Sequence, residues 1–387
     1  MSQKISAFYY IKNNKRRVAV LAVSLAMFFI ANYLMTFLLS TTTETFQKIL
    51  TETTKYVQYI TLNEDDLETD FSDPSKSYAR IYADAVSERC KEIVPLLKEC
   101  DGVEDAFMAA IAYSRVTSVV GEYTVEIPLV TREQMETLLQ KTDAVLIDGR
   151  LPENADEVVL DLKLMKNYGY EVGDKLSQSS EITVVGVIDC AHYFGCGLAD
   201  EAKPYTNTAI CVVSDGSISD LRTVAKGQGI MLEHSDFFDV KEGKRELKEE
   251  IVDVISTSTN LISVGFMAVI FVLVIIVNIS YLRDRRSEWC LYASIGYRRN
   301  TIYFSIIREL LFTFCIAILA AFLICVALMV LLDGLVIGAR GLLCRFFLWD
   351  TVIEILCAYI ALFGALQLPI RIEIYRIKTI DAIDDDI

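Results

Sequence analysis

Residues 261–282 read LISVGFMAVIFVLVIIVNISYL, and no charged side chain lies between Asp253 and Arg283. A helix needs about 20 apolar residues to cross the hydrocarbon core of a bilayer. This stretch is long enough, so it predicts a transmembrane helix. Three other stretches predict spans in the same way: residues 18–40, 309–332 and 346–370. The last of these is weaker at its start, where Asp350 and Glu354 interrupt the apolar run.

Two interpretations fit the first stretch: a cleaved signal peptide and a permanent anchor. Its apolar run exceeds the roughly 7–15 residues of a signal-peptide core, and no small-residue cleavage site follows it. We therefore expect residues 18–40 to stay in the membrane as an anchor.

The composition agrees with a membrane protein that has a large polar part. Of the 387 residues, 53% are hydrophobic and 23% are charged. This is too apolar for a disordered chain and unusual for a soluble enzyme. The formal net charge of −15 argues against nucleic acid as a partner, because a phosphate backbone attracts Lys and Arg.

The distribution of basic residues predicts the orientation of the chain, because short cytoplasmic segments are enriched in Lys and Arg. Three segments carry basic clusters and are expected in the cytoplasm: residues 1–17, 283–308 and 371–387. Residues 41–260 hold 21 basic and 41 acidic side chains, so we expect them outside, along with the short loop 333–345. Arg340 and Arg345 in that loop run mildly against the rule.

The outer region 41–260 is predicted to be an α+β domain. Helical patterns cover residues 78–100 and 131–141, the latter with Thr131 as N-cap. Apolar spacing also predicts that the first span continues outward as a helical stalk, through Phe46, Ile49, Leu50, Thr53, Val57 and Ile60. The alternative is that ordinary helices pack on the domain. Strand patterns cover residues 106–113, 116–130, 144–147, 157–160, 182–188 and 208–213.

The chain lacks the motifs of common enzymes. No P-loop, G-x-S-x-G, H-E-x-x-H or paired C-x-x-C occurs in it, so we expect no catalytic residue, metal site or cofactor on this chain. Cys190, His192 and Cys196 fit no common zinc spacing. A Cys190–Cys196 disulfide and free thiols both remain open, as does any pairing of the other outer cysteines, Cys90, Cys100 and Cys211.

The most informative segment is the predicted cytoplasmic loop, which reads RDRRSEWCLYASIGYRRN over residues 283–300. It predicts a short amphipathic helix that ends at Gly296 and is flanked by basic clusters. Two interpretations fit this pattern: docking into a groove on a cytoplasmic protein, and attachment to anionic lipid.

With these residues, the loop resembles that of FtsX-like permeases, the membrane subunits of MacB-type (type VII) ABC transporters. Glu288 and Gly296 stand where that family has its Glu and Gly, and Glu309 stands where it has an acid opening the third span. The C-terminal end is similar too, because Pro369 closes the fourth span. Thr379 departs from the Pro that is common in the family's tail.

The outer region resembles the extracytoplasmic core domain of the same family in four short motifs. They are residues 148–152 (DGRLP), 156–160 (DEVVL), 173–174 (GD) and 182–187 (ITVVGV). The resemblance spans nearly the whole chain. It implies an α-helical membrane protein with four transmembrane helices and a MacB-like α+β domain inserted between the first and the second.

The resemblance implies the permease subunit of an ABC transporter in the cell membrane, with both termini in the cytoplasm. A separate cytoplasmic ATPase would bind ATP and Mg²⁺ and move the outer domain by mechanotransmission, to export or extract a peptide, lipoprotein or antimicrobial. The permease would form a homodimer, or a heterodimer with a related chain, among membrane lipids. We expect the ATPase-coupling surface to comprise Arg285, Arg286, Glu288, Leu291, Ile295, Gly296 and Arg298.

Two alternative functions are compatible with the sequence. Within the same family, the chain would regulate cell-wall hydrolases or serve as a sensing module without a transported substrate. Outside it, the chain would be a membrane-anchored receptor that needs no ATPase. The loop pattern at residues 283–300 disfavours the receptor, which has no need of such a segment.

Overall fold

The computed structural model describes residues 15–67, 69, 77–119, 121–177, 179–200, 205 and 207–376. For residues 16, 17, 79, 179, 180, 250–264, 266, 267, 270 and 350 only the backbone is described. The chain divides into two compact units. The helical unit comprises Met1–Leu38, Thr257–Leu332 and Arg345–Ile387, and the sheet unit comprises Leu39–Ser256 and Asp333–Cys344.

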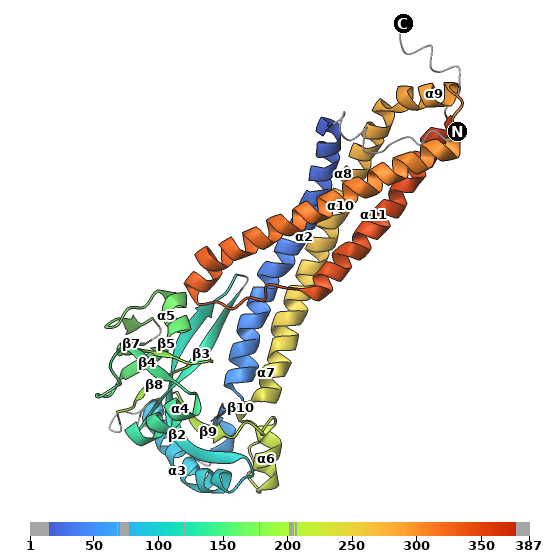
Figure 1. Cartoon of the computed structure of the whole chain (residues 1–387). Coiled ribbons are helices and arrows are strands. Elements are labelled where there is room, and N and C mark those ends of the chain that lie inside the picture. The colour runs from blue at the N-terminus through green and yellow to red at the C-terminus, as the bar shows by residue number, and fades with distance from the viewer. Residues whose placement is uncertain are drawn as a thin grey trace. The chain divides into compact units, whose positions relative to one another are not determined.

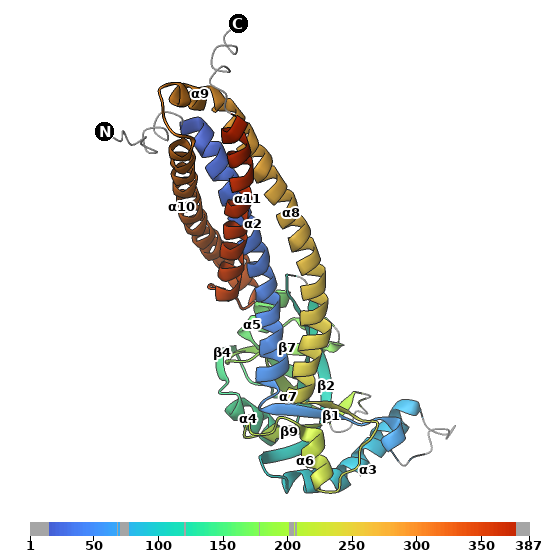
Figure 2. The same cartoon turned by 90° about the vertical axis from the view of Figure 1, so that its right-hand side faces the viewer.

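Long apolar helices build the helical unit. Its helices are α2 Lys15–Gln47, α8 Asp253–Asp284, α9 Arg286–Ser294, α10 Arg299–Leu332 and α11 Trp349–Arg376. Figures 1 and 2 show α2, α8, α10 and α11 bundled together. Three regions of the described chain are long and apolar enough to span a membrane: Val18–Thr53, Arg299–Arg340 and Thr351–Arg376.

The fourth predicted span, residues 261–282, falls within α8. Part of its side chains lies outside the described residues. The total of four membrane spans therefore stays a prediction, as does the insertion of the second domain between the first two.

Aromatic side chains join three helices of the helical unit. The Tyr359 hydroxyl on α11 donates a 2.5 Å hydrogen bond to the backbone oxygen of Leu25 on α2. The Tyr359 ring meets Phe28 of α2 and Phe314 of α10 edge-on, at centroid distances of 5.4 and 5.7 Å. Such pairs contribute about 0.5–1.5 kcal/mol each beyond their burial. These contacts fix α2, α10 and α11 side by side.

One mixed sheet of ten strands organises the described part of the sheet unit. The strand order is β10-β1-β9-β2-β3-β8-β5-β7-β4, and β6 pairs with β7. The pairs β3–β8 and β5–β7 are parallel, and the other neighbours are antiparallel. The strands are β1 Val57–Thr61, β2 Val103–Thr117, β3 Glu122–Val130, β4 Val145–Gly149, β5 Glu157–Asp161, β6 Lys175–Leu176, β7 Ser179–Asp189, β8 Gly195–Leu198, β9 Thr208–Ser214 and β10 Asp236–Phe238.

Apolar side chains pack on both faces of this sheet. Every residue of β9 is buried. Because side chains alternate along a strand, Cys211 packs with Leu138 of α4 on one face, and Ile210 packs with Val86 of α3 on the other. The helices of this unit are α3 Tyr78–Lys98, α4 Arg132–Lys141, α5 Leu162–Tyr168, α6 Leu221–Gly227 and α7 Val240–Glu246.

Most of the predicted elements of region 41–260 are confirmed, and so is its α+β character. The two predicted helices correspond to α3 and α4, and the Gln134 side chain of α4 accepts a 3.1 Å hydrogen bond from the backbone N–H of its N-cap, Thr131. The predicted strands correspond to β2, β3, β4, β5, β7 and β9. Strand β8 was not predicted, because its sequence GCGL has no alternation of apolar and polar residues.

The predicted stalk is wrong at its far end. Helix α2 ends at Gln47 and continues as a π-helix, η1, over Lys48–Thr53, but Val57 and Ile60 belong to strand β1. These two side chains pack in the two different cores, as residues three apart on a strand must. In place of the hydrogen bonds of a continued helix, the backbone of β1 forms hydrogen bonds with β9 and β10.

The segment between α10 and α11 belongs to the sheet unit. The Tyr193 hydroxyl donates a 2.7 Å hydrogen bond to the oxygen of Gly341, and the Asn167 amide donates one of 3.0 Å to the oxygen of Arg340. A Cβ at Gly341 would lie 2.4 Å from the backbone oxygen of Lys163, so this close approach requires glycine. The segment contains the π-helix η4 Asp333–Ile337 and the 3-10 helix η5 Gly338–Arg340.

Two of the short sequence motifs, residues 148–152 and 156–160, lie on the two sides of one turn between β4 and β5. Arg150 donates to both carboxylate oxygens of Glu157, at 2.7 and 2.6 Å. Glu157 also accepts hydrogen bonds from the backbone N–H groups of Glu153 and Asn154, at 2.9 and 3.1 Å. These partners, Arg150 foremost, hold the pKa of Glu157 well below its usual range. The turn thus depends on an ionised carboxylate.

We predict that Glu157→Gln loosens this turn in a pH-dependent way. A carboxyl whose pKa is lowered by folding stabilises the folded state at neutral pH, and that stabilisation is lost as the pH falls. Amides of residues 150–160 should therefore exchange with deuterium faster in the variant than in the wild type at neutral pH. The difference should shrink below pH 4.5, the ordinary pKa of the group.

Glu153→Gln is the matched control, because Glu153 contacts Glu157 through its backbone. Equal exchange in Glu157→Gln and the wild type at neutral pH would contradict the prediction.

Candidate functional site

The short helix α9 connects α8 to α10 in the loop singled out by the sequence. Helix α8 ends at Asp284, α9 covers Arg286–Ser294, and α10 begins at Arg299. Arg285 is the N-cap residue of α9 and therefore lies at the junction of α8 and α9. The amphipathic helix predicted here is present.

Arg285 is almost fully buried, with 3% of its side chain exposed. Its guanidinium forms a 2.5 Å ion pair with Glu309 of α10 and a 3.3 Å ion pair with Glu288 of α9. It also donates a 3.0 Å hydrogen bond to the Tyr281 hydroxyl of α8 and lies over the ring of Trp289, 5.5 Å from its centroid. We call these five residues the arginine clasp. One side chain thus joins α8, α9 and α10.

Gly296 ends α9 by a Schellman turn. Its φ is +100°, a left-handed conformation that L side chains rarely adopt. The N–H of Gly296 donates to the oxygen of Ala293, and the N–H of Tyr297 donates to that of Tyr292, both at 3.1 Å. The rings of Tyr292 and Tyr297 also meet edge-on, 5.9 Å apart. The turn redirects the chain from α9 toward α10.

The seven residues predicted for the coupling surface lie in different environments. Arg285 points inward as the centre of the clasp, and Gly296 shapes the turn. Leu291 and Ile295 are 56% and 65% exposed although they are apolar. Of the remaining three, Arg298 is exposed and Arg286 and Glu288 are half-buried.

Sequence reasoning singled out Glu288 but missed the other three partners of Arg285 within the clasp. Glu309 was noted only as a family acid, and Tyr281 and Trp289 were not singled out. A usable signal was present, because Glu309 directly precedes a long apolar run, and a carboxylate buried there requires a cation nearby.

Cys190, His192 and Cys196, which were considered for metal binding, are not part of this loop. No group of His, Cys, Asp and Glu in the described part of the chain could hold a metal ion. Cys190 and Cys196 are free thiols, not a disulfide, and so are Cys90, Cys100 and Cys211. Burial raises the pKa of Cys190 to about 12, so this thiol is protonated at neutral pH and suited to packing, not to metal ligation.

A family model described as FtsX-like permease C-terminal matches residues 260–378. No curated protein matches the chain in sequence. Among solved structures, the periplasmic region of MacB from Actinobacillus actinomycetemcomitans is similar with 10% identity and a TM-score of 0.27, covering 51% of this chain and 94% of that one. The extracellular domain of the noncanonic ABC-type transporter YknZ from Gram-positive bacteria is similar with 11% identity and a TM-score of 0.25, covering 48% and 99%.

Apolar helices of membrane-spanning length and the family match define a membrane protein of the permease class. Residues 260–378 match the C-terminal domain of FtsX-like permeases. The resemblance to FtsX-like permeases seen in the sequence is thereby confirmed for this region. The arginine clasp and α9 lie inside the matched region.

We predict that breaking the clasp from one side destabilises the helical unit. Arg285→Met leaves Glu309 buried without its cation and should cost about 3–5 kcal/mol. Glu309→Leu leaves Arg285 with only its longer ion pair to Glu288, at 3.3 Å, and should cost less. The double variant should be more stable than either single one, because no unpaired charge remains. Thermal unfolding of the full chain in detergent measures all three.

Arg298→Met is the control, because that arginine is exposed at the end of the same loop. Strictly additive effects of the two clasp substitutions would refute the coupling of Arg285 to Glu309.

Proposed function

We propose that this chain is the permease subunit of an ABC transporter whose ATPase is a separate cytoplasmic protein that binds ATP and Mg²⁺. The observation that supports this most is that the clasp holds α9 from inside while Leu291 and Ile295 stay exposed. An apolar pair on a fixed helix, flanked by arginines, suits a groove on a partner protein. The chain has no P-loop of its own, so the nucleotide would be bound by that partner.

The same contacts supply a route for movement. A force on α9 would reach α10 at Glu309, ten residues after the helix begins, because the buried ion pair with Arg285 costs much energy to open. Helix α10 continues into residues 333–344, which hydrogen-bond to Asn167 and Tyr193 of the sheet unit. We infer that ATP-driven motion reaches the sheet unit in this way, as mechanotransmission, and that Arg285 acts by transmitting it.

We further propose that the sheet unit lies outside the cell membrane, with both termini in the cytoplasm. Residues 333–344 bind to the sheet unit, which supports placing this loop and region 41–260 on one side of the bilayer. The family resemblance supports a dimer, either of two copies or with a related permease. It also supports export or extraction of a peptide, lipoprotein or antimicrobial.

We predict that replacing Leu291 and Ile295 together by Ser removes the docking surface and leaves the clasp intact. The amount of a P-loop ATPase that co-purifies with the full chain from native membranes should fall at least about tenfold, because a helix that docks in a groove is held by its apolar anchor residues. Quantitative mass spectrometry of the captured complex measures this. Glu288→Lys with Gly296→Asp should have the same effect by deforming α9.

Val145→Ser with Ile147→Ser is the matched control, because these apolar residues are exposed on β4 and far from α9 in sequence. Full recovery of the ATPase by the Leu291 and Ile295 double variant would overturn the coupling proposal.

The orientation can be tested with cysteines at exposed positions. We predict that Glu136→Cys on α4 reacts with a membrane-impermeant maleimide in intact cells, whereas Arg298→Cys reacts only after the cells are permeabilised. The wild type supplies the background from the ten native cysteines. The opposite labelling pattern would reverse the proposed topology.

A further inference from the structure

The apolar face of α9 stays largely open to solvent among the described residues. Leu291 and Ile295 are four residues apart, so their side chains lie on one side of the helix, and both are more than half exposed. Apolar residues at this spacing are typical of a helix face that another segment covers. The arginine clasp holds α9 in place, so turning this face inward would break a buried ion pair.

The end of α11 lies beside the start of α10. Tyr303 of α10 donates a 2.8 Å hydrogen bond to Oε1 of Gln367 and accepts one of 3.3 Å from Nε of Arg371, both on α11. Helix α10 begins four residues before Tyr303, and α11 continues for five residues after Arg371. At about 1.5 Å per residue these lengths are about 6 and 7.5 Å, so α11 ends close to the level at which α10 begins. Figures 1 and 2 accordingly show the end of α11 close to α9.

The segment that follows α11 is therefore well placed to cover α9. Residues 377–387 read IKTIDAIDDDI and lie outside the described residues; we call them the acidic tail. These 11 residues reach about 36 Å when extended, at about 3.3 Å per residue. Helix α9, with 9 residues, is about 13.5 Å long. The acidic tail starts near the turn that ends α9 and is long enough to run along the whole helix.

The pattern of the acidic tail complements α9 in polarity and in charge. Ile380, Ile383 and Ile387 follow one another at intervals of three and four residues, which gives one apolar strip if the segment is helical. The acidic tail holds four acidic residues and one basic residue, whereas the loop 283–300 holds five basic residues and two acidic ones. Such charges favour one register between two apolar faces.

We propose that the acidic tail docks on Leu291 and Ile295 of the same chain. Its isoleucines cover these two apolar side chains, and its aspartates lie beside the arginines of the loop. A partner protein that docks on α9 needs the same two side chains, so the tail and the partner exclude each other. Only this exclusion rests on the proposed function; the docking of the tail does not. Residues 379–387 lie beyond the region that matches FtsX-like permeases, so the proposal concerns this chain in particular.

The experiment uses the full chain, purified without any ATPase, in nanodiscs of phosphatidylcholine. The photo-crosslinker p-benzoylphenylalanine replaces Ile295, an exposed apolar residue. After illumination and digestion with trypsin, mass spectrometry should find residues 379–387 attached at position 295. Phe304 is the matched control position, because it is apolar, exposed and adjacent to Tyr303, which contacts α11. The yield there should be at least about tenfold lower, since a docked segment is concentrated at its own site.

Two tail variants test the apolar and the charged contacts separately. Ile380→Ser with Ile383→Ser should lower the yield at position 295 at least about tenfold, because the apolar anchors are lost. Asp384→Asn with Asp386→Asn should lower it at low salt, and the difference from the wild type should shrink in about 1 M salt, where charges are screened. Ala382→Ser, which keeps the isoleucines and the charge, is the control and should leave the yield unchanged.

Deletion of residues 379–387 tests the exclusion. The shortened chain should capture at least about twofold more P-loop ATPase from native membranes than the wild type, because its docking surface is always available. If the proposed function fails, neither chain captures an ATPase, whereas the crosslink at position 295 still forms. The two failures are therefore distinguishable.

Three results would overturn the docking of the tail. One is an equal yield at positions 295 and 304, and another is an unchanged yield in the Ile380 and Ile383 double variant. The third is attachment of position 295 to lipid in place of the tail. Equal or lower capture of the ATPase after the deletion would overturn the exclusion.

Discussion

The buried ion pair between Arg285 and Glu309 is the interaction on which the loop between α8 and α10 depends. Two charges taken out of water are tolerated only if their partners stay in place. Arg285 caps α9, touches Tyr281 of α8 and pairs with Glu309 of α10, so the three helices cannot shift independently. The charged side chains of Arg285 and Glu309 are buried, whereas the apolar side chain of Leu291 is exposed. This is the reverse of the usual arrangement on a surface helix.

The sheet unit is built to be rigid by different means. Its central strands are buried on both faces, and helices cover each face of the sheet. The chain passes between the two units after Leu38, Ser256, Leu332 and Cys344. Residues 333–344 are fastened to the sheet unit by side-chain hydrogen bonds and by the close approach at Gly341.

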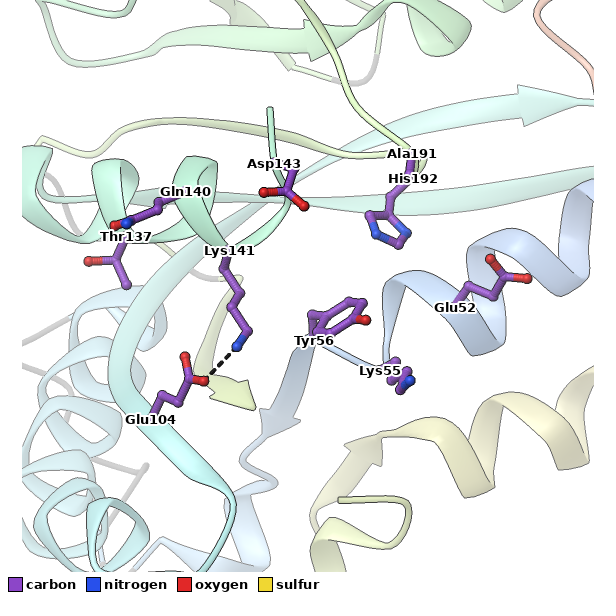
Figure 3. Close-up of a pocket in the computed structure, with 10 residues that line it drawn as sticks. All are labelled: Glu52, Lys55, Tyr56, Glu104, Thr137, Gln140, Lys141, Asp143, Ala191 and His192. Atoms are coloured by element: carbon purple, nitrogen blue, oxygen red, sulfur yellow. Dashed lines mark hydrogen bonds and ion pairs between the residues drawn. The ribbon is translucent and has the colours of Figure 1, made fainter. Parts of the chain in front are cut away.

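Helices α4 and α9 end in the same kind of turn. Gly296 and Asp143 both occupy the left-handed position of a Schellman turn. At Gly296 a Cβ would meet nothing within 4 Å, so the turn geometry alone accounts for the glycine. At Asp143 the strained backbone brings a carboxylate to a cavity of the sheet unit that Tyr56 and Lys141 also line (Figure 3).

The sequence by itself determined the apolar helices, the α+β character of the acidic region and the family resemblance, because hydrophobic periodicity and composition are local properties. It also located the end of α9, since Gly296 satisfies a backbone need that depends on its neighbours alone. Only the tertiary structure decided that Val57 and Ile60 form a strand, because their partners β9 and β10 lie far along the chain. It also decided that Arg285 is buried against Glu309, and that Arg371 of α11 meets Tyr303 near the start of α10. Such groupings depend on long-range packing, which no local pattern specifies.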